Sequence, residues 1–164
     1  MSTSVSPIAT PEERARCDAA IAAWAASAGV GAGVGAGVLA VDRDPDLARW
    51  YIRLKGDEKD VVTIWLTIRQ RSLRHETHFM PAPETNVCDT YRYLLRRNSA
   101  LRGMRFCLGD EDAVYLVGEL PVADVTEDEI DRIVGASLEY VDECFPAAMT
   151  LGYATMYRRR PGRR

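Results

Sequence analysis

The chain has 164 residues, a net charge of −3 and a sequence pI of about 5.5. This acidic balance argues against a nucleic-acid-binding protein, for which a basic domain is expected, and no apolar run approaches the roughly 20 residues of a membrane span. The first ten residues form no basic and apolar leader, so we expect a cytoplasmic protein without membrane contact. One domain is expected at this length, with a core that needs no metal or disulfide.

The first predicted element is a helix that begins near residue 10. Thr10, Pro11 and Glu13 have the spacing of a capping box with proline at the first helical position. Apolar residues then recur at helical spacing up to a natural stop at Gly29; they are Cys17, Ala20, Ile21, Trp24, Ala25 and Ala28. We expect residues 1–9 to be disordered and a single domain to occupy residues 10–157.

A glycine- and alanine-rich tract, GVGAGVGAGVLA, covers residues 29–40. Within it Gly31, Gly33 and Ala36 match the dinucleotide-binding pattern G-x-G-x-x-A. That pattern normally follows a buried strand and opens a helix, whereas here it follows a helix and no helical apolar pattern continues after it. We therefore expect a flexible connector that is poorly ordered or forms an irregular loop. A nucleotide-binding sensor is the alternative.

Alternation of apolar and polar residues predicts strands in the middle of the chain. The period of two runs through residues 50–54 and again through residues 62–68. The polar segment 56–60 between them is typical of a turn, so the pair is predicted to form a hairpin. A third strand is expected over residues 73–80.

After two prolines that interrupt the sheet, a helix is expected over residues 84–97. Its apolar stripe consists of Val87, Tyr91, Leu94 and Leu95. Two further strands are expected over residues 104–108 and 113–120, joined by an acidic turn at residues 109–112.

A last helix is expected from Thr126, which forms a second capping box with Glu129. Pro146 should limit or kink this helix. The predicted order is α-β-β-β-α-β-β-α, an α+β fold with an antiparallel sheet of about five strands and helices at the start, middle and end. Residues 158–164 contain five arginines and are expected to form a disordered basic tail, with contact to phosphates or an acidic partner as the alternative.

Candidate catalytic or metal-binding groups are few. His75 and His78 lie three residues apart in a predicted strand, so they should face opposite sides and cannot share a metal ion. We interpret both as surface or edge histidines. Ser72 near His75 is weak support for a catalytic triad, and no phosphate-binding-loop, kinase or G-x-S-x-G motif is present. We therefore expect no catalytic residue, no cofactor and no metal.

The four cysteines are Cys17, Cys88, Cys107 and Cys144. They form no C-x-x-C pair, which argues against a zinc knuckle or a thioredoxin-like motif. Each falls within an apolar pattern. We interpret them as small buried side chains in a reducing compartment.

Large aromatic residues occupy the strand positions that alternate with the predicted core-facing positions. If Leu66 is buried beneath the first or last helix, Tyr51 and Trp65 lie on the opposite face, and Tyr115 is expected to join them. A second helix or a partner subunit could cover this face. Alternatively, it is an exposed platform for another chain, since tyrosine and tryptophan are enriched at interfaces.

Residues 62–160 resemble the bacterial YbjN-domain family over a dense and collinear set of segments. These segments are VTIWLTI at 62–68, MPAPE at 80–84, YRYLLRRN at 91–98, YLVGELP at 115–121 and IDRIVGASLEYVDECFPAAMTLGY at 130–153. The glycine-rich insert after the first helix departs from the family pattern.

The resemblance implies the fold of type III secretion chaperones, which are small acidic proteins that bind a partner polypeptide, often as dimers. It implies a non-enzymatic chaperone-like adaptor or sensory transduction regulator whose partner is a protein, either a client or a second subunit. Tyr91 and Arg96 on the middle helix are then a second candidate contact beside the sheet face. A nucleotide- or small-molecule-binding sensor and an enzyme of unrecognised class remain alternatives.

Overall fold

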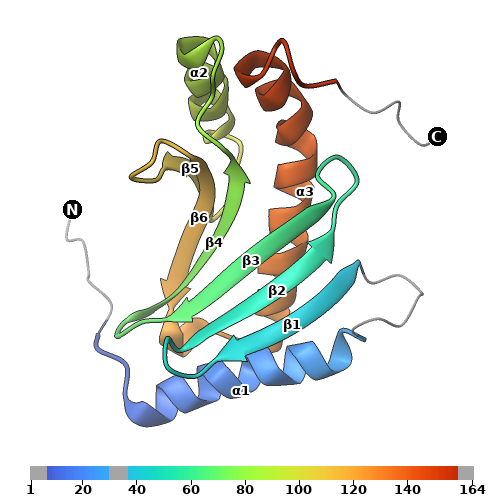
Figure 1. The fold of residues 1–164 in the computed structure, drawn as a ribbon. Helices are drawn as coiled ribbons and strands as arrows, with labels where there is room; N and C mark the ends of the chain where they lie inside the picture. Colours follow the sequence, from blue (N-terminus) through green and yellow to red (C-terminus); the bar gives the residue numbers. More distant parts are fainter. Residues whose placement is uncertain (1–6, 30–36, 159–164) are drawn as a thin grey trace.

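A six-stranded antiparallel sheet is the centre of the computed structural model, which describes residues 7–29 and 37–158 (Figure 1). The strand order is β1-β2-β3-β4-β6-β5. The elements in chain order are α1 (Pro11–Ser27), β1 (Val38–Asp44), β2 (Arg49–Lys55), β3 (Val61–Ile68), β4 (Ser72–Met80), α2 (Val87–Arg97), β5 (Arg105–Leu108), β6 (Val114–Pro121), the 3-10 turn η1 (Val122–Asp124) and α3 (Glu127–Gly152). The predicted α+β class and antiparallel sheet are confirmed.

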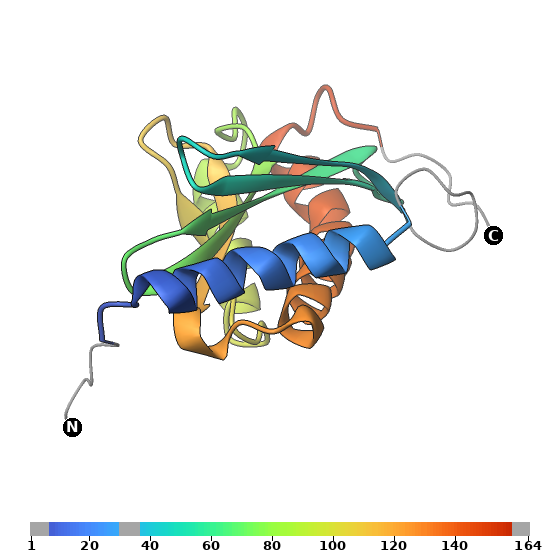
Figure 2. The ribbon, with the colours of Figure 1, turned by 90° about the horizontal axis from the view of Figure 1, so that it is seen from below.

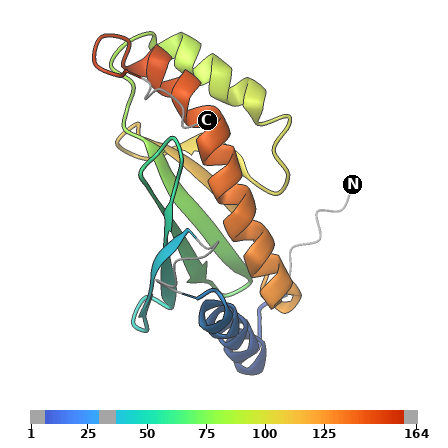
Figure 3. The ribbon, with the colours of Figure 1, turned by 90° about the vertical axis from the view of Figure 1, so that its right-hand side faces the viewer.

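The core lies between one face of this sheet and the helices α1 and α3 (Figures 2 and 3). Alternate residues of the strands point into it, as the period of two requires. Leu66 is fully buried there, as predicted, together with Ile21 from α1 and Ile133 from α3. Among the described residues, no helix lies against the opposite face of the sheet.

Two tryptophan indoles fix α1 in place. Trp24 on α1 donates its Nε1–H to Asp131 of α3 at 3.0 Å. Trp50 on β2 donates its Nε1–H to Asp18 of α1 at 2.9 Å. Each ring is buried while its polar end has a partner, which is how indole is usually accommodated in a core.

The strand β1 corrects the predicted extent of the glycine-rich connector. The sequence predicts a connector over residues 29–40, whereas residues 38–40 begin β1 and the buried Val38 belongs to the core. The sheet therefore has six strands instead of about five. Alternation failed to indicate β1 because a bulge between Val38 and Ala40 interrupts its register and its second half is polar. Gly31, Gly33 and Ala36 lie outside the described residues.

The start of α2 also differs from the prediction. The sequence predicts a helix from Glu84, but α2 begins at Val87. The backbone N–H groups of Glu84 and Thr85 instead donate to the carbonyl oxygen of Gly152, each at 2.9 Å. They satisfy an orphan acceptor at the end of α3. Segments 80–86 and 151–154 are thereby joined although they lie far apart in sequence.

The last helix differs from the sequence prediction in its capping box, and of the two effects expected at Pro146 the limit is absent. The hydroxyl of Thr126 accepts from the N–H of Glu129 at 3.2 Å, but the second capping box is only half formed, because the Glu129 carboxylate pairs with Arg132. Pro146 does not end α3, which continues to Gly152 with a core residue, Ala148, beyond the proline.

Candidate functional site

Three aromatic side chains lie on the face of the sheet that α1 and α3 leave uncovered. Tyr51 on β2 is the register partner of Trp65 on β3, and the rings of Trp65 and Tyr115 have centroids 6.5 Å apart at an interplanar angle of 47°. All three are half-buried. We call Tyr51, Trp65 and Tyr115 the aromatic band. The strand register brings Tyr51 and Trp65 together, and the ring contact across β4 adds Tyr115.

Charged side chains hold the band in place. The Arg49 guanidinium lies 5.7 Å from the centroid of the Trp65 ring and donates to the Thr67 hydroxyl at 2.9 Å. On β4, Arg74 and Glu76 form an ion pair of 2.7 Å with only 25% and 18% of their side chains exposed. The band is therefore bordered by both signs of charge.

Tyr115 is ordered by two neighbours. Its hydroxyl donates to Glu111 at 2.5 Å, and this hydrogen bond is the main cause that raises the pKa of Tyr115 to about 12. The His78 ring meets the tyrosine edge-on, with 5.3 Å between centroids. Burial, followed by the charge of Lys59, lowers the pKa of His78. At neutral pH both rings are therefore uncharged.

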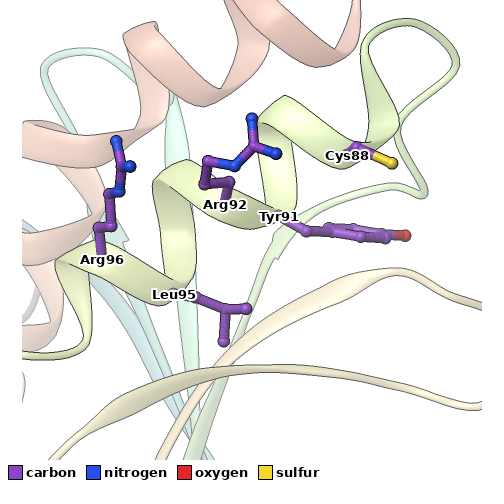
Figure 4. A pocket seen from close by; sticks show the side chains of 5 residues that line it. All are labelled: Cys88, Tyr91, Arg92, Leu95 and Arg96. Carbon is purple, nitrogen blue, oxygen red and sulfur yellow. The ribbon is translucent and has the colours of Figure 1, made fainter.

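Tyr91 and Arg96 lie on α2, away from the band. They share an outward stripe with Cys88, Arg92 and Leu95 (Figure 4). Arg92 and Arg96 project from one side of the helix, and Tyr91 and Leu95 from the neighbouring side.

An apolar groove of about 220 Å³ separates α2 from β5. We call it the α2–β5 groove; it is lined by Tyr91, Leu94, Leu95, Phe106, Cys107, Leu108 and Val114. Cys107 is also the register partner of Tyr115, so β5 connects the groove with the aromatic band.

Sequence reasoning missed the exposure of the groove's rim. The sequence pattern assigns Leu95 to an apolar stripe of the middle helix, but only Leu94 of that stripe is deeply buried. Leu95 is 68% exposed and Leu108 on β5 is 48% exposed. The sequence does hold a signal for this exposure. Leu95 and Arg96 lie one helical turn after Tyr91 and Arg92, so Leu95 shares a helix face with two arginines.

His75 is buried, which corrects its interpretation as a surface or edge residue. Only 3% of it is exposed, because its strand position faces α3. Burial, aided by the charges of three arginines, lowers its pKa to about 4. His78 faces the other side of β4, as predicted, and Ser72 on that outer side donates to Glu119. Ser72 and His75 therefore do not face one another.

The four free cysteines differ in burial. Cys17 and Cys144 are buried as predicted, but Cys88 is exposed and Cys107 is only half-buried. Cys88 is exposed because it lies on the outward stripe of α2. Within residues 7–29 and 37–158, no group of three His, Cys, Asp or Glu side chains is placed to hold a metal ion. None of the described helices combines the length and apolarity needed to cross a membrane.

Comparison with known proteins identifies relatives without assigned activities. A family model named YbjN, with the description "Putative bacterial sensory transduction regulator", matches residues 18–149. The uncharacterized protein Rv0487 of Mycobacterium tuberculosis is 36% identical over 108 residues, which are 66% of this chain and 59% of that protein. The uncharacterized protein ML2442 of Mycobacterium leprae is 34% identical over 110 residues. The match thus spans about 60% of the length of these relatives.

Among solved structures, one similar chain belongs to the heterodimeric complex ExoU–SpcU of the type III secretion system of Pseudomonas aeruginosa. The sequence identity is 15% and the TM-score is 0.47, over 58% of this chain and 80% of that chain. This similarity is too low to carry an argument on function.

Proposed function

The chain belongs to the YbjN family, and from this premise we propose that it is a non-enzymatic, chaperone-like adaptor or regulator that binds a protein partner in the cytoplasm. The observation that carries the proposal is the aromatic band. Large amphipathic side chains on an uncovered sheet face are the residues that protein interfaces favour. Soluble proteins seldom leave a contiguous patch of this kind unused.

The contacts of the band favour binding over a purely structural role. Arg49 stacks on Trp65, and Glu111 and His78 hold Tyr115. Side chains that are already ordered lose little conformational entropy when a partner binds. Since Tyr51 and Trp65 are direct register partners and the Trp65 and Tyr115 rings meet across β4, the band offers one surface that extends from β2 to β6.

The arrangement of polar side chains supports a non-enzymatic role. The weak candidate triad of Ser72 and His75 is divided between the two faces of β4. His75 itself is enclosed in the core, where a substrate cannot reach it without local unfolding. A catalytic pair must lie within hydrogen-bond reach of each other and of the substrate.

The test compares Trp65→Ala with Leu47→Ala, a truncation at a position that is 52% exposed and lies outside the band. Circular dichroism first establishes that both variants are folded. Affinity capture from native lysate and analytical ultracentrifugation then measure partner binding and self-association. We expect Trp65→Ala to weaken the interaction by about 30-fold, equivalent to about 2 kcal/mol at an interface hot spot, and Leu47→Ala to leave it unchanged. Identical captured partners and identical self-association for both variants would contradict the proposal.

A further inference from the structure

The α2–β5 groove combines a buried apolar floor with an exposed apolar rim. Leu94, Phe106 and Val114 form the floor and are 5% exposed or less. Leu95 and Leu108 form the rim, with 68% and 48% exposed. The rim residues come from two elements on opposite sides of the groove, so a side chain that enters between them would contact apolar atoms on both sides.

The backbone edge of β5 is blocked at its buried residue, Phe106. β5 is the last strand of the sheet, so its outer edge would ordinarily be open for pairing. The carboxamide of Asn98 occupies that edge: its Oδ1 accepts from the N–H of Phe106 at 2.7 Å, and its Nδ2 donates to the Phe106 carbonyl at 3.2 Å. A continuous strand ladder is interrupted at Phe106, which favours a partner that docks through side chains, as a helix laid in a groove does.

The charges around the groove indicate which side chains fit. Arg92 and Arg96 lie one helical turn apart on the outward stripe of α2, beside the groove and next to its lining residues Tyr91 and Leu95. Arg92 forms an exposed pair with Asp89 at 2.7 Å, whereas Arg96 has no ion pair among the described residues. The turn at the other side carries Asp110, Glu111 and Asp112. An occupant with carboxylates therefore fits only with its acidic edge along α2.

We propose that the α2–β5 groove binds an amphipathic helix of a partner protein, with the apolar face of that helix between Leu95 and Leu108 and an acidic edge along Arg92 and Arg96. This inference rests on the proposed function and names the chemistry of the partner. A second copy of the chain fits less well, because two-fold packing of α2 on α2 would bring the arginines of one copy against those of the other.

The probe is a set of fluorescent amphipathic helical peptides with leucine at helical spacing and either glutamate or lysine along one edge, measured by fluorescence anisotropy. We expect the glutamate peptides to bind at least about tenfold more tightly than their lysine counterparts. Leu95→Asp should abolish binding, and Arg96→Glu should reverse the preference between the two edges. Both positions are exposed, so the variants should keep the fold, which circular dichroism verifies.

Several outcomes overturn the inference. They are equal binding of both peptide types, absence of saturable binding by every peptide up to about 1 mM, and a dimer that becomes monomeric on Leu95→Asp, which would show that a second copy occupies the groove. Trp65→Ala separates the two proposals, because it should leave peptide binding intact. If captured partners are lost with Trp65→Ala and retained with Leu95→Asp, the partner uses the aromatic band: the groove proposal fails while the proposed function stands.

Discussion

Gly118 on β6 leaves the space that the ring of His75 on β4 occupies. A Cβ atom at residue 118 would lie 2.4 Å from Cε1 of His75 and 2.2 Å from the carbonyl oxygen of Gly103. Neither distance is tolerated by real side chains, and the carbonyl is backbone that cannot rotate away. The buried histidine and the glycine are therefore a matched pair across two neighbouring strands.

Gly118→Ala should consequently destabilise the protein by about 3 kcal/mol, the upper end of the usual cost of overpacking a core. The matched control is Gly135→Ala on α3, where an added Cβ meets no atom within 4 Å. Alanine there should raise the free energy of unfolding by about 0.5–1 kcal/mol, because glycine is a poor helix former. Chemical denaturation of both variants measures the two effects, and equal midpoints would contradict the packing described for Gly118.

The pH dependence of stability should reflect His75. Its pKa is about 4 in the folded protein and about 6.5 when unfolded, so the unfolded state binds the proton more readily. The free energy of unfolding therefore has its full value above pH 6.5. It falls by about 3 kcal/mol as the pH drops toward 4, because His75 takes up a proton more readily in the unfolded chain. His75→Gln should flatten this part of the profile relative to wild type in urea denaturation series. A steep loss that survives in His75→Gln would assign the effect to other groups.

Core burial predicts a large penalty at Leu66. Leu66→Ala removes a side chain with no exposed surface and should cost about 2–5 kcal/mol, from lost transfer energy and the cavity that remains. Leu95→Ala is the control for the same chemical change at an exposed position and should alter stability by less than about 0.5 kcal/mol. Similar melting temperatures for the two variants would show that the sheet faces have been assigned wrongly.

Thiol reactivity should separate the cysteines. Cys88 is exposed and should react first with a disulfide reagent under native conditions, followed slowly by the half-buried Cys107. Cys17 should react only on unfolding, because burial raises its pKa to about 12 and excludes the reagent. Mass spectrometry of partially modified protein identifies the order, and Cys88→Ser should remove the fast phase. A fast phase that persists in this variant would place another thiol at the surface.

Sequence patterns predicted most of the fold because its central strands are covered on one face only. In such strands the alternation of apolar and polar residues indicates which side chains face the core. Leu66 faces the core, and its neighbour Trp65 faces the uncovered side of the sheet. The edge strand β1 escaped prediction because an edge strand has little buried surface to impose a pattern, and its bulge breaks the period.

The site was less predictable because it depends on contacts between distant segments. The grouping of Tyr51 with Trp65 follows from a local hairpin and could be anticipated. The burial of His75 requires β4 to lie beside β6, and the block at Phe106 on β5 requires the Asn98 side chain to reach that edge. Neither contact produces a hydrophobic periodicity that could be recognised in the sequence.

The two hydrogen bonds from Glu84 and Thr85 to the Gly152 carbonyl bear on how the protein is made. A ribosome synthesises α2 well before it reaches residue 152, so during translation the segment that leads into α2 has no acceptor to hold it. The helix can be fixed against α3 only after the end of α3 has emerged. The α2–β5 groove is therefore among the last surfaces of the domain to take its final shape.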